Sequence, residues 1–380
     1  MSDIPPSGVF MPKLPDDLLF RIFIHCDAKT LIRVQATNHF WMESLSTQEF
    51  VAEIENCWRK RGCSLFGHFG HNDESRRSSD WIIKMSSHTG QRFPATLPFL
   101  MTQQGWFDVV GIDKGVFYMR YSSVGVVSNL VAWNPISRRK FVISDHIHEI
   151  GDETSFLLAF LYFPKTVNYA VVSIYLELGD NPRTVFTLFN SSVRSWSPPL
   201  ECPPYVRRLD PQYVTVNRIV FWATWSHSNE TEFPPYIVSF SPLTAEFQQL
   251  PLPGEALTTC HTLLNRDGHL CIAINDHNFQ AYNSVIWQPD VVNEEIVWTK
   301  LFEVGGNGPS FIPAVMVEND VIHVLERHVE VNDEEGVEFT HIHLRRFYSG
   351  CGRRTLLWAN YEGDVKLRSV NTFYESFYPV

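Results

Sequence analysis

The sequence predicts an α+β multidomain chain, in which a small module of three helices precedes a large all-β domain. Three observations support this: apolar residues recur at helical spacing near the N-terminus, strand-length apolar runs follow from Trp106 onward, and similar stretches recur about every 45 to 58 residues. We expect the helical module over 12–54, a linker over 55–100 and the β domain over 101–380.

The bulk composition is typical of folded domains with many short strands. Hydrophobic residues make up 44% of the 380 positions and aromatic residues 14%, whereas charged residues make up 19%. Strands favour aromatic and β-branched residues, and the 23 prolines favour turns. The formal net charge of −11 disfavours nucleic acid as a partner, because a polyphosphate backbone attracts basic surfaces.

Nothing in the sequence predicts a membrane or secreted protein. The longest apolar run, Phe156–Phe163, is far below the roughly 18 residues that span a bilayer, and the first residues lack the apolar stretch of a signal peptide. The seven cysteines form no Cys-x-x-Cys pair, so we expect neither a disulfide framework nor a zinc site. We therefore expect a reducing compartment, the cytoplasm, the nucleus or both.

The helical module has recognisable helix starts. Pro15, Asp16 and Asp17 favour the first helix, because proline suits the first turn and carboxylates are stabilised at the positive end of the helix dipole. Asp27 can cap a second helix over 28 to about 38, and a third short helix follows. Three helices over about forty residues bury little surface, so the remaining apolar side chains need either an external partner or the rest of this chain.

The stretch 14–54 resembles the F-box, in the form found at the N-terminus of many plant F-box proteins. The matching features are Leu14-Pro15-Asp16-Asp17-Leu18, Ile22, Lys29-Thr30-Leu31-Ile32-Arg33, Trp41 and Phe50. The resemblance implies that the module binds a Skp-type adaptor, which bridges it to a cullin–RING ubiquitin ligase. Carried over residue by residue, the adaptor-binding or module-core positions are Leu14, Pro15, Leu18, Ile22, Leu31, Val34 and Trp41.

The sequence departs from the family pattern just before Trp41. Thr37-Asn38-His39 stands where the family usually has a Val-Cys-Lys or Val-Cys-Ser step, and Asp27 stands where proline is common. The polar residues at 37 and 38 bear on how strongly the module binds its adaptor.

Strands and turns alternate through the second part of the chain. Each repeat ends in an aromatic strand, a polar turn and a second apolar element, as in AWNPISRRKFVI, TLFNSSVRSWSPP, SFSPLTAEFQQLPLP and VIWQPDVVNEEIVWTKLFEV. Such a unit at this period predicts the blades of a β-propeller, with a β-sandwich as the structural alternative. The expected strands include Val116–Met119, Asn129–Trp133, Ala170–Tyr175, Val185–Phe189, Ile219–Trp222, Tyr236–Phe240, Leu270–Ile274, Ser284–Trp287 and Val321–Leu325.

This second part resembles the F-box-associated, kelch-like domain of plant F-box proteins. The stretches that carry the resemblance are Trp133–Ser137, Ser195-Trp196, Ser239–Thr244, Leu250–Pro253 and Trp298–Phe302. The resemblance implies an F-box module followed by an all-β kelch-like β-propeller. It also implies a substrate-recognition adaptor of an SCF-type cullin–RING E3 ubiquitin ligase, whose target is an unidentified protein.

Loops on a rigid scaffold commonly carry binding residues, so we expect target capture on loops such as Trp225–Pro235 and Glu303–Phe311. A β-propeller scaffold or ligand sensor that works outside a ubiquitin ligase is the alternative.

No residue pattern predicts catalysis, a metal or a cofactor, so we expect a chain that is not an enzyme. His146/His148 and His341/His343 are His-x-His pairs, but no further ligand accompanies them at metal-site spacing. Gly305–Gly308 lacks the Lys-Ser or Lys-Thr of a phosphate-binding loop, and we expect it to connect two blades.

Overall fold

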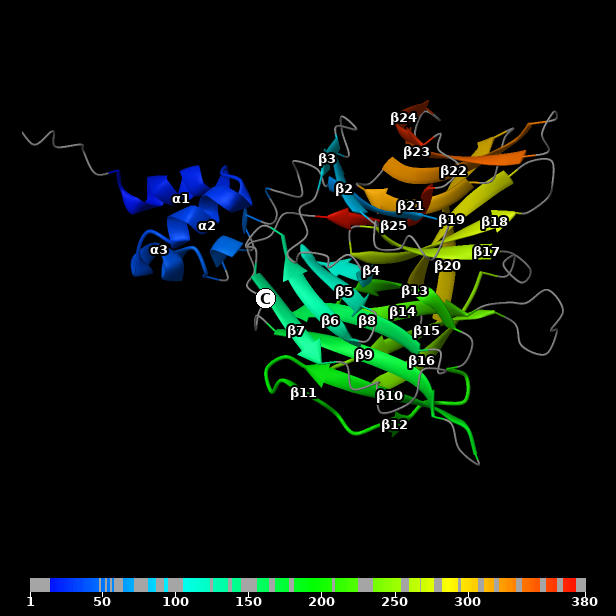
Figure 1. Ribbon diagram of the computed structural model, residues 1–380, viewed down its shortest axis with the longest axis horizontal. Coiled ribbons are helices and arrows are strands. Elements are labelled where there is room, and N and C mark those ends of the chain that lie inside the picture. Colours follow the sequence, from blue (N-terminus) through cyan, green and yellow to red (C-terminus); the bar gives the residue numbers. More distant parts are fainter. Residues whose placement is uncertain are drawn as a thin grey trace, which may run out of the picture. The chain divides into compact units, whose positions relative to one another are not determined.

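The computed structural model of the 380-residue chain separates into two compact units, Met1–Arg61 and Gly62–Val380 (Figure 1). The structure describes the backbone of residues 14–47, 49–51, 53–54, 57, 64–71, 81–86, 92–94, 105–123, 126–135, 139–144, 156–163, 168–177, 181–206, 209–224, 235–253, 260–266, 268–276, 282–292, 295–306, 311–317, 321–332, 337–348, 353–360 and 365–373. Side chains are described for most of these residues within 14–57 and 107–303.

The first unit contains the three predicted helices, which are α1 (Asp16–Ile24), α2 (Ala28–Gln35) and α3 (His39–Ser44). Its core is formed by fully buried aliphatic side chains, Leu31, Leu45 and Ile54, together with Phe50. The second helix ends three residues earlier than predicted. Asn38 has an extended backbone and caps α3, so it cannot continue α2.

Asp27 caps α2, as the sequence predicts. Its carboxylate accepts a hydrogen bond of 2.6 Å from the backbone N–H of Thr30, which would otherwise lack a partner at the helix start. This hydrogen bond lowers the pKa of Asp27 below its ordinary value of 3.8.

The described part of the second unit consists of six antiparallel sheets, named here sheets 1 to 6. Sheet 1 combines β1 (Ser64–His71), β2 (Trp81–Ser86), β3 (Arg92–Pro94) and β25 (Val365–Phe373). Sheet 2 contains β4 (Gly105–Asp113), β5 (Val116–Ser123), β6 (Val126–Asn134) and β7 (Arg139–Ser144). Sheet 3 contains β8 (Phe156–Phe163), β9 (Asn168–Glu177), β10 (Arg183–Asn190), β11 (Ser195–Trp196) and β12 (Leu200–Glu201).

The remaining sheets follow the same order along the chain. Sheet 4 contains β13 (Leu209–Val216), β14 (Ile219–Thr224), β15 (Tyr236–Ser241) and β16 (Glu246–Pro251). Sheet 5 contains β17 (Cys260–Arg266), β18 (His269–Asp276), β19 (Tyr282–Val292) and β20 (Glu295–Gly306). Sheet 6 contains β21 (Phe311–Val317), β22 (Val321–Asn332), β23 (Val337–Tyr348) and β24 (Arg353–Asn360).

One edge strand of each sheet lies beside the corresponding strand of the next sheet. We call β4, β8, β13, β17, β21 and β25 the inner strands; each contacts the next in this order, and β25 contacts β4. Sheet 1 is completed by the two ends of the unit, because β25 pairs with β1. The fold is therefore β-propeller-like, and the β-sandwich alternative is wrong because a sandwich has two sheets.

Sheet 4 buries side chains on both of its faces. On β14, Val220 and Trp222 pack with sheet 3, whereas Phe221 and Ala223 pack with sheet 5. Alternate residues of a strand point to opposite faces, so a strand buried on both sides needs a continuous apolar run. This requirement explains why the predicted strands are mostly apolar, and all of them lie within observed strands.

The repeated stretches that suggested blades are the third and fourth strands of successive sheets. They correspond to the hairpins β6–β7, β10–β11, β15–β16 and β19–β20. In the first three hairpins, the second-last residue of the first strand is a buried aromatic residue: Trp133, Phe189 or Phe240.

The expected linker over 55–100 differs from the observed structure. Strands β1, β2 and β3 lie within this range and belong to the second unit. The strand β1 has the sequence SLFGHFGH, whose glycines and histidines weaken a strand pattern, and it pairs with β25 from the far end of the chain. A pairing over that sequence distance leaves no local signal.

We predict that Asp27→Ala destabilises the helical unit by about 1 kcal/mol, because the Thr30 amide loses its cap. The pKa of Asp27 is lowered in the folded protein, so its contribution is complete above about pH 4 and is lost as the pH falls through the folded pKa. Amide hydrogen exchange of α2 in the full chain measures both effects. Asp27→Asn, which keeps an acceptor oxygen, is the control, and equal exchange in Asp27→Ala and the unmodified chain would contradict the prediction.

Candidate functional site

The candidate site is one face of α1. Leu18 and Ile22 are four residues apart on α1, so they lie on one side of the helix, and Leu14 and Pro15 come directly before its first residue, Asp16. The exposed fractions of Leu14, Leu18 and Ile22 are 48%, 41% and 49%, and Pro15 is also exposed. We call these four residues the α1 apolar face.

The opposite side of α1 holds the helix in place. The ring of Phe23 meets Trp41 edge-on at 5.1 Å between centroids, and Phe20 lies 6.0 Å from Trp41 and 5.7 Å from Phe50. Edge-to-face aromatic pairs at these separations are favourable beyond the area that they bury. The helix thus has apolar residues on two sides, of which one packs inside the unit and the other faces outward.

The seven predicted adaptor-binding or core residues fall into two groups. Leu14, Pro15, Leu18 and Ile22 form the α1 apolar face. Leu31 is fully buried, while Val34 and Trp41 are half-buried. The structure therefore gives the second group a place within the packed side of the unit, and the role of the first group in binding stays a prediction.

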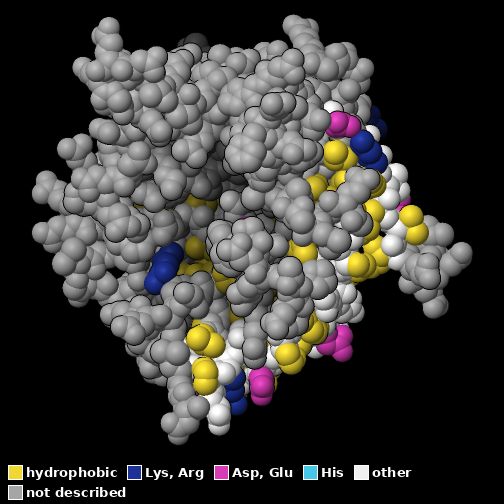
Figure 2. All heavy atoms as spheres, turned by 90° about the vertical axis from the view of Figure 1, so that its right-hand side faces the viewer, with side chains coloured by type: hydrophobic (Ala, Val, Ile, Leu, Met, Phe, Trp, Pro, Cys, Tyr) yellow, Lys and Arg dark blue, Asp and Glu magenta, His cyan; other side chains and the backbone are white. Residues whose placement is uncertain are grey.

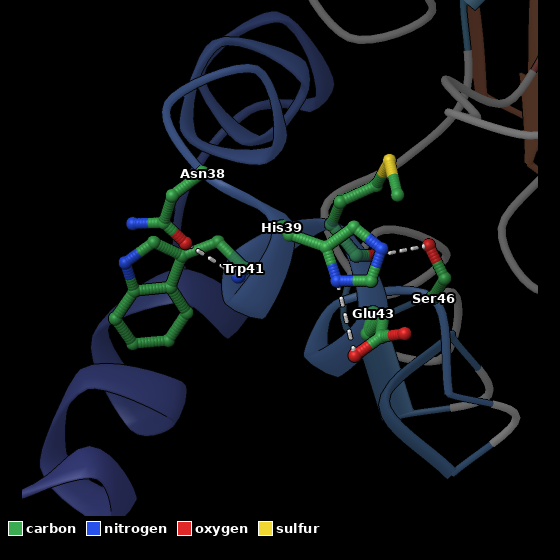
Figure 3. Close-up of polar contacts among 6 residues, drawn as sticks. Asn38, His39, Trp41, Glu43 and Ser46 are labelled. Atoms are coloured by element: carbon green, nitrogen blue, oxygen red, sulfur yellow. Dashed lines mark hydrogen bonds and ion pairs between the residues drawn. The ribbon is translucent and has the colours of Figure 1, made fainter.

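The polar residues that depart from the family pattern make local hydrogen bonds (Figure 3). The side-chain oxygen of Asn38 accepts a bond of 3.0 Å from the backbone N–H of Trp41, and the Thr37 hydroxyl donates to the Val34 carbonyl at 2.7 Å. His39 lies 3.4 Å from the carboxylate of Glu43 on the exposed side of α3. These residues end one helix and begin the next, so their polarity is compatible with an intact module.

Two exposed residues of α3 were not among the predicted site residues. Phe40 is 50% exposed and Met42 is 47% exposed. Sequence periodicity placed Phe40 in the third helix, but a helix of six residues has too few positions to show which side faces outward. The ring of Phe40 contacts Trp41 at 4.8 Å between centroids, so it lies next to the aromatic cluster that supports α1.

Among the described side chains of the second unit, the large exposed apolar ones are spread over several elements. They are Val142, Leu176, Val193, Leu200, Leu243, Val291 and Val297, and each lies on a different strand or turn. On the face drawn in Figure 2, hydrophobic side chains likewise reach the surface among charged and neutral ones. Single exposed apolar residues are common on protein surfaces, so they do not mark a site.

The predicted target-binding loops lie mostly outside the described residues. This holds for Trp225–Pro234 and for 307–310, while 303–306 and Phe311 belong to β20 and β21. Gly305 and Gly306, expected in a loop, pair with Asn283 and Tyr282 at the end of β20. Glycines are tolerated at such a strand end, where the pattern alone suggested a loop.

The candidate metal sites are only partly described. His146 and His148 lie outside the described residues, whereas His341 and His343 lie on β23, where they pair with His328 and Glu326 of β22. Among the described side chains, no group of three His, Cys, Asp or Glu residues is placed to hold a metal ion.

The buried thiols have the properties of structural cysteines. Cys202 and Cys271 are buried, and burial raises the pKa of each to about 12. A neutral thiol is a poor nucleophile and a poor metal ligand.

Among the helices that the structure describes, none is long and apolar enough to cross a membrane.

We predict that Leu31→Ala lowers the stability of the helical unit by about 2–5 kcal/mol, because it leaves a cavity in the core. Ile22→Ala removes a side chain that is 49% exposed and is expected to change the stability by roughly 0.5 kcal/mol or less. Hydrogen exchange of α2 and α3 in the full chain separates the two variants. Equal destabilisation by both would show that the α1 apolar face is part of the core.

Comparisons with known proteins find likeness in structure only. No family model and no curated protein matches the chain. A TolB protein from Agrobacterium tumefaciens superposes with a TM-score of 0.42 at 11% identity, covering 84% of this chain and 99% of that one. YjhT superposes with a TM-score of 0.38 at 12% identity, covering 67% of this chain and 82% of YjhT. A 6-phosphogluconolactonase from Bacteroides fragilis superposes with a TM-score of 0.37 at 9% identity, covering 80% of this chain and 97% of that one.

Proposed function

We propose that this chain is a non-catalytic substrate-recognition adaptor of an SCF-type cullin–RING E3 ubiquitin ligase. The helical unit binds a Skp-type adaptor through the α1 apolar face, and the sheets bind a target protein. The observation that carries the proposal is the exposure of Leu18 and Ile22 on a helix whose other side is packed, with exposed Leu14 just before its start.

The chemistry of the α1 apolar face suits an apolar groove on a partner. Complete burial of a Leu or Ile side chain contributes roughly 1.5–3 kcal/mol, and the three residues retain about half of their surface for a partner. An amphipathic helix that places its apolar side in a groove is a common recognition mode. The carboxylates of Asp16 and Asp17 flank the N-terminal end of the face, so a basic rim on the groove complements them.

The sheets supply a rigid platform for the target. We propose that sheets 1 to 6 close into one kelch-like β-propeller of six blades, with β25 and β1 joining its two ends. The contacts of the inner strands, which return from β25 to β4, support closure. Closure leaves the outer strands and their turns as the exposed edges on which a protein target binds.

Ubiquitin transfer by such a complex requires no catalytic residue in this chain. Holding a target beside the ubiquitin carrier raises the effective concentration of its lysines, and this proximity is the contribution of the adaptor. The net charge of −11 supports a protein target over nucleic acid. Cys26, Cys57, Cys202 and Cys271 are thiols and not disulfides, which supports a location in the cytoplasm or nucleus.

The adaptor role is tested by co-purification of the full chain with a Skp-type adaptor. We predict that the unmodified chain binds and that the variant Leu14→Ala/Pro15→Ala/Leu18→Ala loses binding at least about tenfold, because it removes apolar contact area. A matched control is Leu176→Ala/Leu200→Ala/Leu243→Ala, whose exposed leucines lie on the second unit, and this control should bind normally. Absence of binding by the unmodified chain would contradict the ligase role and favour a free β-propeller scaffold.

Closure of the propeller is tested by removing its last strand. We predict that a chain ending at residue 364, which lacks β25, loses the single cooperative unfolding transition of the second unit, because β1 keeps only β2 as a partner and the ring opens. Removal of 374–380 alone keeps β25 and is the control. Calorimetry of both chains decides the question, and an unchanged transition in the shorter chain would contradict closure.

A further inference from the structure

The inner edge of β8 is bound by side chains from two other sheets. In sheet 3, β8 is an edge strand that pairs only with β9, so its other edge presents backbone groups without strand partners. Phe160 and Tyr162 are two residues apart, and their N–H groups point to the same edge. The N–H of Phe160 donates to the Tyr213 hydroxyl at 3.0 Å, and the N–H of Tyr162 donates to the Asp113 carboxylate at 2.8 Å.

The two acceptors come from opposite sides of β8. Asp113 is the last residue of β4 in sheet 2, and Tyr213 lies in β13 of sheet 4. Both strands lie beside β8. Sheets 2 and 4 therefore each supply one side chain to the same strand edge.

Tyr213 also reaches the backbone of sheet 2. A Cβ atom added to Gly111 would lie 2.0 Å from the Tyr213 hydroxyl and 2.8 Å from the ring carbon that bears it. No side chain fits at this distance, so glycine at 111 is what allows the tyrosine to lie there. The contact joins β13 to β4 across sheet 3.

Both strands are irregular at this position. The register of β4 shifts between Val109 and Gly111, and the register of β13 shifts between Leu209 and Tyr213. Such bulges bend a strand and redirect its side chains. Burial raises the pKa of the Tyr213 hydroxyl, and the nearby charge of Asp113 raises it further, so the hydroxyl stays neutral.

We propose that Tyr213 and Asp113 form a clasp on β8 that locks sheets 2, 3 and 4 into one rigid body and prevents another strand or ligand from pairing with this edge. The two hydrogen bonds of the clasp each join different sheets, and Gly111 provides the space that Tyr213 needs. The clasp goes beyond the proposed adaptor function, because it concerns the rigidity of the platform and not its partner.

Amide hydrogen exchange of the full chain, measured residue by residue by NMR, tests the clasp. We expect Tyr213→Phe to speed exchange of the Phe160 amide by about tenfold, because only the acceptor oxygen is removed, and to leave the Tyr162 amide within about twofold. Asp113→Ala should speed exchange of the Tyr162 amide and leave the Phe160 amide within about twofold. Asp113→Asn keeps an acceptor oxygen, so it should affect the Tyr162 amide less than Asp113→Ala.

Two further variants complete the test. Tyr205→Phe removes a hydroxyl that donates to the Phe247 carbonyl at 2.9 Å, and it should leave both amides unchanged. Gly111→Ala should speed exchange at Phe160 and lower the melting temperature, and it should lower it less when Tyr213→Ala is also present. Unchanged Phe160 exchange in Tyr213→Phe, or equal effects of Gly111→Ala in both backgrounds, would overturn the clasp.

Discussion

The second unit depends on the requirement that every sheet cover both of its apolar faces. A single four-stranded sheet has no core of its own, and β14 shows the consequence most clearly: Val220 and Trp222 need sheet 3 on one side, and Phe221 needs sheet 5 on the other. Stacking satisfies this requirement for interior sheets but leaves two end faces. Because β25 belongs to sheet 1, the proposed closure of the ring would leave no end face uncovered.

The helical unit resolves the same problem only in part. Its aromatic cluster around Trp41 covers one side of α1, and the caps at Asp27 and Asn38 fix the helix ends. The α1 apolar face stays outside this core. A platform of sheets and a small helical unit with an uncovered apolar face are together the physical basis of the proposed adaptor function.

The sequence predicts local features well and distant pairings poorly. The hairpins and the cap at Asp27 follow from residues close in the chain, and both are observed. The strands β1 to β3 escape detection because β1 contains glycines and histidines and because one of its two partners, β25, lies about 300 residues away. Helical spacing identifies the residues of α1 but not the outward side, since Phe23 and Ile22 are both apolar. The contact between Gly111 and Tyr213 leaves no pattern at all, because it depends on bulges in two strands.

The central claim is that the α1 apolar face binds a Skp-type adaptor while the sheets stay free for a target. The most direct measurement is amide hydrogen exchange of the full chain with and without saturating adaptor. If the adaptor binds this face, amide exchange becomes slower in the helical unit, most strongly over α1. Exchange in the strands of sheets 2 to 5 stays unchanged. Protection of the sheets with none in α1, or no protection anywhere, would contradict it.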